Sequence, residues 1–370
     1  MTPNVCVVGA GAFVPSRRVS NARISRAIPG WPAERIEEKL GIRERRFLWD
    51  IDEATGRAVP PPEDDGHVYP ATNTDMCEVA LRKALTTSGV DAGELDALFV
   101  VTCTPDAPHF NHDAMQLHHR LGLREDAFAL VVDDGCGGTT YVLDLVKKMM
   151  DGGRFRTVAV VASAFTSPLV NREVYLDELP PGPGRSKTLQ GYLSMYVFGD
   201  GAGAVVLQTK QDAPEGAGIL ASFSGNAHGD LVIRKGGGLL KLPYQPGRSR
   251  PADMAFVVDG FRVARSYPEY MQKCLDTVLS PRPELKGEVK RYYFHQPNKR
   301  VMDAFVSRAG LSPEAVACNV DLYGNTSAAG MLILLAEDLE AGRVRLGAGD
   351  IVLVAAVGAN IHYGAQLIRL

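Results

Sequence analysis

Residues 131–140 read VVDDGCGGTT, and this stretch decides how the rest of the chain is interpreted. An apolar run at 127–132 leads into it, and residues 141–150 follow it with apolar positions at helical spacing. The pattern predicts a strand, a sharp glycine turn and a helix. Cys136 should therefore lie at a helix N-terminus, where the helix dipole and free backbone N–H groups favour a thiolate over a thiol.

Cys136 has two interpretations when it is taken alone. A thiolate is a nucleophile, and the glycines on both sides of the residue leave room for a substrate to reach the sulfur. The alternative is a structural cysteine in a turn, because free cysteine is among the most buried residue types. The rest of the chain favours the first interpretation.

The composition is that of a globular soluble protein. The chain has 370 residues, of which 45% are hydrophobic and 22% are charged, and this length suits two domains or two similar halves. The net charge of −3 argues against a nucleic-acid partner, and no apolar run is long enough to span a membrane. Six scattered cysteines without a CxxC pair fit a reducing compartment, and the N-terminus does not look like a signal peptide. We therefore expect a cytoplasmic protein that binds neither nucleic acid nor membrane.

A second stretch near the C-terminus resembles the one around Cys136. Residues 320–328, VDLYGNTSA, can be laid against residues 131–139, so that Asn325 comes close to the place of Cys136. Each copy has a β-rich run before it, and an apolar helix and a further β-rich run after it. For the first copy these are residues 97–102, 141–150 and 157–162. For the second copy they are residues 290–295, 331–339 and 351–356. The chain is thus predicted to use one strand–turn–helix–strand unit twice.

Strands that alternate with amphipathic helices imply parallel βαβ layers. Two such halves packed together give an α/β/α sandwich with pseudo-twofold symmetry. We expect an N-terminal half at residues 1–212, which carries the cysteine, and a C-terminal half at residues 213–370. Because the central helices would begin at Cys136 and Asn325, both turns should face one shared cleft.

Two further polar residues could work with the thiol. His295 follows an apolar strand and precedes a proline-containing turn, and a histidine at a strand end can donate to a carbonyl oxygen or move a proton. Asn325 offers a side-chain N–H donor for a developing enolate or oxyanion. Each also has an ordinary structural explanation, a hydrogen-bonded histidine at a strand edge and common turn chemistry. The three residues are more persuasive together than singly.

Several motifs, taken together, resemble the ketoacyl-ACP synthase III branch of the thiolase-fold condensing enzymes. They occur in the family's order and approximate spacing over the whole chain: GIRERR at 41–46, the Cys136 turn, FGDGAGA at 198–204, HQPN at 295–298 and YGNTSAA at 323–329. The resemblance implies a thiolase fold, in which duplicated βαβ halves form a five-layered αβαβα sandwich with pseudo-twofold symmetry.

The resemblance also implies a mechanism. Cys136 would attack an acyl thioester, and the backbone N–H groups of Cys136 and Ala359 would hold the oxyanion. A malonyl-type extender would then lose CO₂ while His295 and Asn325 stabilise the enolate, and the product would be a β-ketoacyl thioester. No tightly bound cofactor and no metal is expected. The acyl group would arrive on the phosphopantetheine of an acyl carrier protein or on coenzyme A.

The resemblance further implies a homodimer. In it, Phe110 would reach from the loop at 108–121 toward the acyl pocket of the partner. Asn298, Val357 and Asn360 are the other residues expected to contact substrate. Scattered arginines could form a basic rim for a phosphopantetheine arm or its carrier: Arg43, Arg45, Arg46 and Arg248. Four nearby histidines, 109, 112, 118 and 119, lack the spacing and partner ligands of a metal site.

The chain departs from the family pattern around the cleft. Val357 stands where the family has phenylalanine, and the polar residues Asn360 and His362 follow it. The tryptophan that stacks on the coenzyme A adenine in typical members is replaced by Arg35, with Trp31 four residues earlier. The family arginine for the same cofactor falls near residues 168–169, Pro-Leu. These departures favour a carrier protein over coenzyme A as the acyl donor.

Asp133 and Asp134, beside the nucleophile, are a further departure. One of them could cap the helix, or a carboxylate could help to deprotonate an acceptor. The departures resemble those of relatives in polyketide or other secondary metabolism. Some of these condense unusual acyl groups, and others pass the acyl group to a hydroxyl or amine of a small-molecule acceptor without forming a carbon–carbon bond. Condensation is the first hypothesis and such transfer the second. A thioester hydrolase and an inactive partner subunit are weaker alternatives.

Overall fold

The computed structural model describes residues 4–28, 31–62, 69–107, 110–172, 194–214, 216–229, 231–233 and 256–370. Three proline-containing stretches of the sequence, 50–72, 177–187 and 243–253, are predicted to be loops. The last two lie outside the described residues, as do His109 and Arg248. The stretch 50–72 was expected to be a loop throughout. Its described part contains a small antiparallel hairpin instead, made of β4 (Asp50–Ile51) and β5 (Ala58–Val59).

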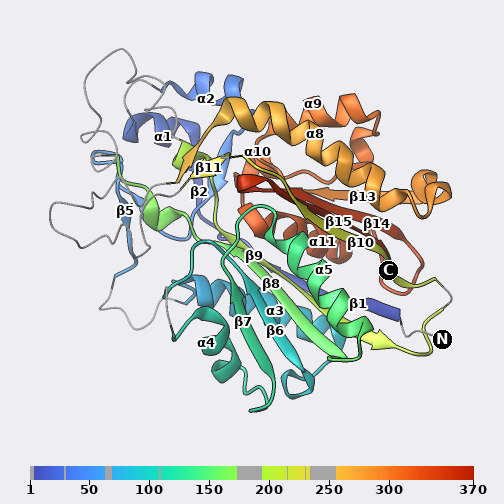
Figure 1. The fold of residues 1–370 in the computed structure, drawn as a ribbon. Coiled ribbons are helices and arrows are strands. Elements are labelled where there is room, and N and C mark those ends of the chain that lie inside the picture. Colours follow the sequence, from blue (N-terminus) through green and yellow to red (C-terminus); the bar gives the residue numbers. More distant parts are fainter. Residues whose placement is uncertain are drawn as a thin grey trace.

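Two sheets form the framework of the molecule (Figure 1). The first sheet has the order β1 (Asn4–Phe13), β9 (Gly201–Lys210), β8 (Thr157–Ala164), β6 (Ala97–Val101) and β7 (Phe128–Val132). The second has the order β10 (Gly218–Asn226), β15 (His362–Arg369), β14 (Ile351–Val357) and β13 (Val289–Phe294). In each sheet the first two pairings are antiparallel and the third is parallel. This shared order is the duplication that the sequence predicts.

The second half departs from the duplication at one place. Residues 320–323, which were aligned with a strand, form the short helix α10 (Val320–Tyr323). Oε1 of Gln296 accepts the backbone N–H groups of Asn319 and Val320, each at 3.1 Å, and so satisfies the first donors of a helical turn. The position of β7 is taken instead by one parallel bridge, between Tyr292 and Val316.

Helices form the other three layers. The central layer holds α5 (Gly138–Asp151) and α11 (Gly330–Glu340), and each of them contacts strands of both sheets. The outer layers are α3 (Asn73–Ser88) with α4 (Asp113–Arg120) on the first sheet, and α8 (Gly260–Leu279) with α9 (Lys299–Ala309) on the second. Figure 1 shows these layers stacked from α8 and α9 at the top to α3 and α4 below. The predicted five-layered α/β sandwich is thereby confirmed.

Smaller elements gather at one end of the sandwich (Figure 1). They are β2 (Arg18–Ser20), α1 (Asn21–Ala27), α2 (Ala33–Leu40), β3 (Glu44–Arg46), β11 (Val232–Ile233) and β12 (Val257–Val258). α1 and α2 pack over a small core of their own that includes Ile24, Ile28 and Phe47. No helix in the described part of the chain is long and apolar enough to cross a membrane.

The central layer requires a close approach between β9 and α11. A Cβ atom on Gly203 would lie 2.7 Å from the backbone nitrogen of Ile333, closer than real Cβ contacts. We expect Gly203→Ala to lower the free energy of unfolding by about 1–3 kcal/mol, because the helix backbone must shift. Urea denaturation would measure the change. Gly93→Ala is the matched control, since a Cβ there meets nothing within 4 Å, and an equal effect in both variants would contradict this explanation.

Candidate active site

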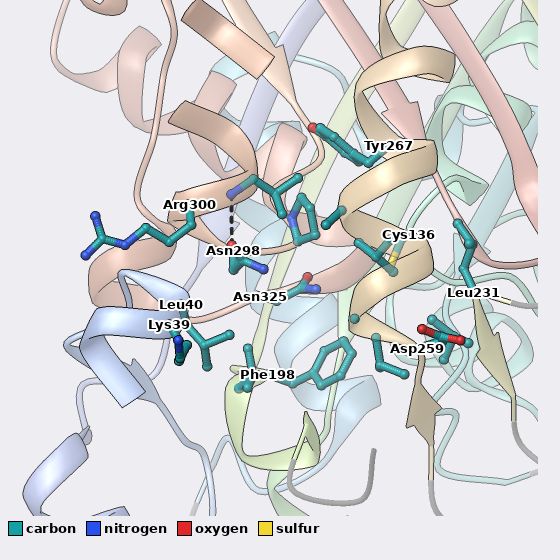
Figure 2. Close-up of a pocket in the computed structure, with 18 of the residues that line it drawn as sticks. Lys39, Leu40, Cys136, Phe198, Leu231, Asp259, Tyr267, Asn298, Arg300 and Asn325 are labelled. Carbon is teal, nitrogen blue, oxygen red and sulfur yellow. Dashed lines mark hydrogen bonds between the residues drawn. The ribbon is translucent and has the colours of Figure 1, made fainter. Parts of the chain in front are cut away.

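A cavity of about 1350 Å³ opens at the end of the sandwich where the small elements gather. Its wall brings together the predicted site residues Cys136, His295, Asn298, Asn325, Val357 and Ala359. Figure 2 shows Cys136 and Asn325 at the same cavity, beside the helix that carries Tyr267. The rest of the wall is largely apolar and comes from α1, α2, the two short strands β11 and β12, and the first turns of α8. Such a cavity suits an acyl chain and its pantetheine-like arm.

Cys136 sits in the turn between β7 and α5. The backbone N–H of Asp134 donates to the carbonyl of Val132, and that of Gly138 donates to the carbonyl of Gly135, so the chain turns sharply at the cysteine. α5 begins at Gly138, two residues after the thiol. The hydroxyl of Thr139 donates to the carbonyl of Ala328 at 2.7 Å. This bond ties the turn to the corresponding turn of the second half.

The protonation of Cys136 differs from the expectation for a helix N-terminus. Burial raises the pKa of the thiol to about 11, and the Asp134 carboxylate also raises it. A hydrogen bond from Ser327 lowers the pKa but does not compensate for burial. The loss of water on burial outweighs the stabilisation that the start of the helix offers to a thiolate. Near neutral pH the residue is therefore a thiol. It needs a base before it can attack a thioester.

His295 is the side chain at the cavity that can accept a proton near neutral pH. It follows β13, and its Nδ1 lies 3.2 Å from the backbone carbonyl of Ser327. A carbonyl can only accept, so Nδ1 carries the proton and Nε2 keeps its lone pair. Burial lowers the pKa of His295 to about 4, with a small contribution from His362, so the ring is neutral near pH 7. A neutral imidazole with a free Nε2 can accept the proton of a thiol.

Asn325 presents its amide donor to the cavity. Its Oδ1 accepts the backbone N–H of Ser327 at 2.9 Å, which leaves the Nδ2 group to donate elsewhere. The backbone is fixed on both sides, because the N–H of Asn325 donates to Val197 and the carbonyl accepts from Gly199. A neutral, fixed N–H donor is what a developing enolate oxygen requires.

Ser327 connects the three groups, and sequence reasoning missed it. Its hydroxyl lies 3.6 Å from the sulfur of Cys136, its carbonyl holds His295, and its N–H holds Asn325. It adopts φ 49°, in the left-handed region that residues other than glycine rarely occupy. The only signal in the sequence was its position two residues after Asn325. Tyr267 was also missed; its hydroxyl donates to the carbonyl of His295.

The buried imidazole of His295 makes the stability depend on pH. Above pH 6.5 the ring is neutral in the folded and the unfolded chain and contributes no pH dependence. As the pH falls from 6.5 to about 4, the unfolded chain binds the proton first, so the free energy of unfolding falls by up to about 3 kcal/mol. Below about pH 4 the loss stays constant.

The pH dependence can be measured by urea denaturation of the wild type and of His295→Gln between pH 4 and 7. The variant should lack the part of the slope that His295 contributes. Parallel stability curves for the two proteins would contradict a buried, neutral His295.

Of the other predicted site residues, Phe110 and Asn360 lie away from the cavity, and Asn298 lies in its wall. Phe110 is 95% exposed on the loop before α4, with φ 56°, and does not line the cavity of its own chain. Asn360 is exposed on the turn between β14 and β15, with φ 60°, and is also absent from the cavity wall. Asn298 lines the cavity, but its Oδ1 is engaged in capping α9, where it accepts the N–H of Val301. Figure 2 draws this bond as a dashed line.

The arginine rim is not as expected. Arg45 is fully buried and donates to the carbonyl of Val19 and the side chain of Asn21, so it is not a surface residue. Arg43 pairs with Asp321 at 2.6 Å, and Arg46 lies over the ring of Tyr323. Arg45 lies in the cavity wall, and four further basic residues line the cavity as well: Arg35, Lys39, Arg262 and Arg300. Their positions depend on the folding of α2, α8 and α9, which the local sequence does not reveal.

The described residues contain no cluster of histidine, cysteine, aspartate or glutamate that could hold a metal ion. Three of the four neighbouring histidines in the sequence are described. His112 precedes α4, and His118 and His119 lie in its last turn.

The fold and the cavity define a thiolase-fold enzyme with a thiol at the centre. Sequence models of the family match in two segments, "3-Oxoacyl-[acyl-carrier-protein (ACP)] synthase III" over residues 132–227 and the C-terminal domain of the same enzyme over residues 285–370. The chain belongs to the ketoacyl-ACP synthase III-like family. It is an acyltransferase of the condensing type.

Individual relatives extend over nearly the whole chain. The beta-ketoacyl-[acyl-carrier-protein] synthase III of Gloeobacter violaceus is 29% identical over 371 residues, which cover 99% of this chain and 98% of that one. The enzyme of the same name from Koribacter versatilis is 28% identical over 368 residues, 98% of this chain and 97% of the other.

Solved structures agree with the fold. The Thermus thermophilus beta-ketoacyl-ACP synthase III superposes with a TM-score of 0.75 at 26% identity, covering 99% of each chain. The Xanthomonas campestris protein OleA, solved with bound lauric acid and lauroyl-CoA, superposes with a TM-score of 0.78 at 17% identity, covering 100% of each chain. At that identity the likeness to OleA concerns the fold alone.

Proposed function

We propose that the protein forms an acyl-Cys136 intermediate from an acyl thioester and condenses it with a malonyl-type thioester, with loss of CO₂. The observation that carries the proposal is the convergence of a thiol, a neutral imidazole and a fixed amide donor on one apolar cavity. In this proposal the N–H groups of Cys136 and Ala359 stabilise the oxyanion, and His295 and Asn325 stabilise the enolate. The pathway we propose is polyketide or other secondary metabolism, as the departures around the cavity suggest.

The tautomer of His295 supports a definite path for the proton. As Cys136 attacks the thioester, its proton passes to Nε2 of His295, and the carrier's sulfur leaves with a proton from solvent. The negative malonyl carboxylate then favours the imidazolium, whose Nε2–H donates to the enolate oxygen as CO₂ departs. When the carbon–carbon bond has formed and the Cys136 thiolate is released, His295 returns the proton. The cycle thus ends with the thiol and the neutral imidazole with which it began.

An acyl carrier protein is the acyl donor we propose, ahead of coenzyme A. The guanidinium of Arg35 lies over the ring of Trp31, 5.1 Å from its centre, and occupies a face on which an adenine would stack. Besides the buried Arg45, the cavity wall carries four basic side chains, from α2, α8 and α9, and an acidic carrier or a phosphopantetheine phosphate would complement them. No tightly bound cofactor is part of the proposal.

A homodimer is also part of the proposal. β7 is the last strand in the order of the first sheet, and its Phe128 and Leu130 are 38% and 37% exposed. Phe110, at 95% exposure, and Met115, at 44%, come from the segment that leads into and forms α4, which contacts β7. An exposed strand edge with apolar side chains favours pairing with a second copy.

One observation favours a second function, transfer of the acyl group to a hydroxyl or amine of a small-molecule acceptor. In the neutral imidazole of His295, Nε2 can accept a hydrogen bond. A general base that deprotonates an alcohol or amine needs such an acceptor. In this function no CO₂ is released, and His295 deprotonates the acceptor as it attacks acyl-Cys136.

The two functions can be separated on one acylated protein. The protein is loaded with acyl carrier proteins or acyl-CoA thioesters of different chain length, and intact mass reports the adduct. Malonyl carrier protein is then added, and CO₂ release and the product are followed. Release of CO₂ together with a β-ketoacyl thioester supports condensation, whereas loss of the adduct only with an alcohol or amine supports transfer. Loss of the adduct as free acid in both cases would indicate a hydrolase.

A further inference from the structure

Asp134 and His362, two of the polar residues that depart from the family pattern, meet behind the nucleophile. Nε2 of His362 lies 2.6 Å from Oδ1 of Asp134, and both side chains are more than four-fifths buried. Two lone pairs would repel at that distance, so the ring nitrogen carries a proton and the contact is attractive. The two atoms are not aligned for a straight hydrogen bond, so the attraction is an electrostatic one between the carboxylate and the N–H of the ring.

The imidazole of His362 is wedged between the two turns that face the cavity. A Cβ atom on Gly137 would lie 2.2 Å from Cδ2 of the ring, and one on Gly358 would lie 2.4 Å from Nε2. The same Cβ on Gly358 would lie 2.5 Å from the backbone nitrogen of Gly137, so the two turns pass very close to each other. Only glycine fits at either position while the ring stays in place.

Hydrogen bonds fix each partner to its own turn. Oδ1 of Asp134 accepts the N–H of Gly135 at 2.8 Å, directly before Cys136. The carbonyl of His362 accepts the N–H of Gly358 at 2.8 Å, directly before Ala359. Through these bonds the pair links Gly135, which precedes Cys136, to Gly358, which precedes Ala359. The link crosses the boundary between the two halves.

We propose that the contact between Asp134 and His362 is a positioning device that holds the N–H groups of Cys136 and Ala359 at the separation that acylation requires. This inference rests on the proposed function, since it concerns the proposed oxyanion donors. Neither side chain touches the substrate, because neither is part of the described cavity wall. An oxyanion hole depends on such fixed geometry, because its donors must already point to where the charge develops.

The pair also favours the neutral resting state of the two reactive groups. The Asp134 carboxylate raises the pKa of the Cys136 thiol, and the charged form of His362 lowers the pKa of His295. Both influences disfavour a thiolate–imidazolium pair before substrate binds.

The test measures the two half-reactions separately. Asp134→Asn keeps the oxygen that accepts from Gly135 but removes the charge, and His362→Gln keeps a nitrogen near the position of Nε2. We expect each variant to slow acylation of Cys136, followed by intact mass in a rapid-quench experiment, by roughly 10- to 100-fold. Release of CO₂ from malonyl carrier protein by the preacylated variant should stay within about twofold of wild type, since His295 and Asn325 are untouched.

A double variant and a matched control complete the design. Asp134→Asn combined with His362→Gln should be no slower in acylation than the worse single variant, because the two act as one pair. Asp151→Asn removes the exposed pair between Lys147 and Asp151 at the end of α5 and should leave both half-reactions unchanged. If one variant fails to fold, the other decides the question alone.

The remaining outcomes would overturn the inference. Equal slowing of acylation and CO₂ release would indicate a general loss of structure, and unchanged acylation would show that the pair does not position the donors. Slowing of CO₂ release alone would show that the pair acts in the decarboxylation step and not in acylation. Failure of the proposed function is distinguishable from all of these, because the wild type would then form no adduct on Cys136.

Discussion

Alanine in place of Cys136 is expected to abolish the acyl adduct and to lower condensation by at least about 10³-fold. The residue supplies the only protein atom in the proposed mechanism that bonds to the acyl group. The wall of the cavity offers no second thiol in the part of the chain that is described. Intact mass after incubation with an acyl carrier protein would measure the adduct, and release of CoA or carrier thiol would measure turnover.

Two controls make the Cys136 result interpretable. Cys318→Ala removes an exposed thiol far along the chain, and its adduct should equal that of the wild type. Thermal unfolding of Cys136→Ala should show a folded protein, since the side chain is small and lines a cavity. An adduct of equal mass on Cys136→Ala and on the wild type would rule out the covalent mechanism.

His295→Ala and Asn325→Ala are each expected to reduce CO₂ release from malonyl carrier protein by about 10²- to 10³-fold. Both side chains are fixed by Ser327, and in the proposal both donate to the same enolate oxygen. The loss of either leaves the developing charge with one donor in a largely apolar cavity. CO₂ release from preacylated protein in a single turnover is the suitable measurement.

The two variants should differ in the first half-reaction. His295→Ala also removes the base that takes the thiol proton, so acylation should slow at neutral pH and recover partly as the pH rises toward the thiol pKa of about 11. Asn325→Ala should acylate at nearly the wild-type rate. Undiminished CO₂ release in both variants would reject their assigned role, and equal acylation rates in both would remove His295 as the base.

Much of the fold could be predicted from the sequence. The alternation of β-rich runs and apolar helices predicted the α/β layers, and the similarity of the turns at Cys136 and Asn325 revealed the duplication. The prediction failed at residues 320–323, because their helix is started by Gln296, a residue 24 positions before Val320. Local patterns cannot report a hydrogen bond that the chain makes to a distant segment.

The candidate site could be predicted in part. Cys136, His295 and Asn325 stood out because each follows a predicted strand or turn, and the structure brings them to one cavity. Ser327 was missed, because a serine in a small-residue run has no distinguishing pattern. Arg45 was wrongly assigned to the surface, since a charged residue is rarely fully buried and only the packing of β2, α1 and β3 encloses it.

The sequence by itself determined which residues carry the chemistry, because nucleophile, imidazole and amide are properties of side chains and their order along the chain. Only the tertiary structure decided their states. Cys136 is a thiol and His295 is neutral because burial removes the water that would stabilise their charges, and burial is set by segments far apart in the sequence. For the same reason only the structure could join Asp134 to His362, which the chain separates by more than two hundred residues.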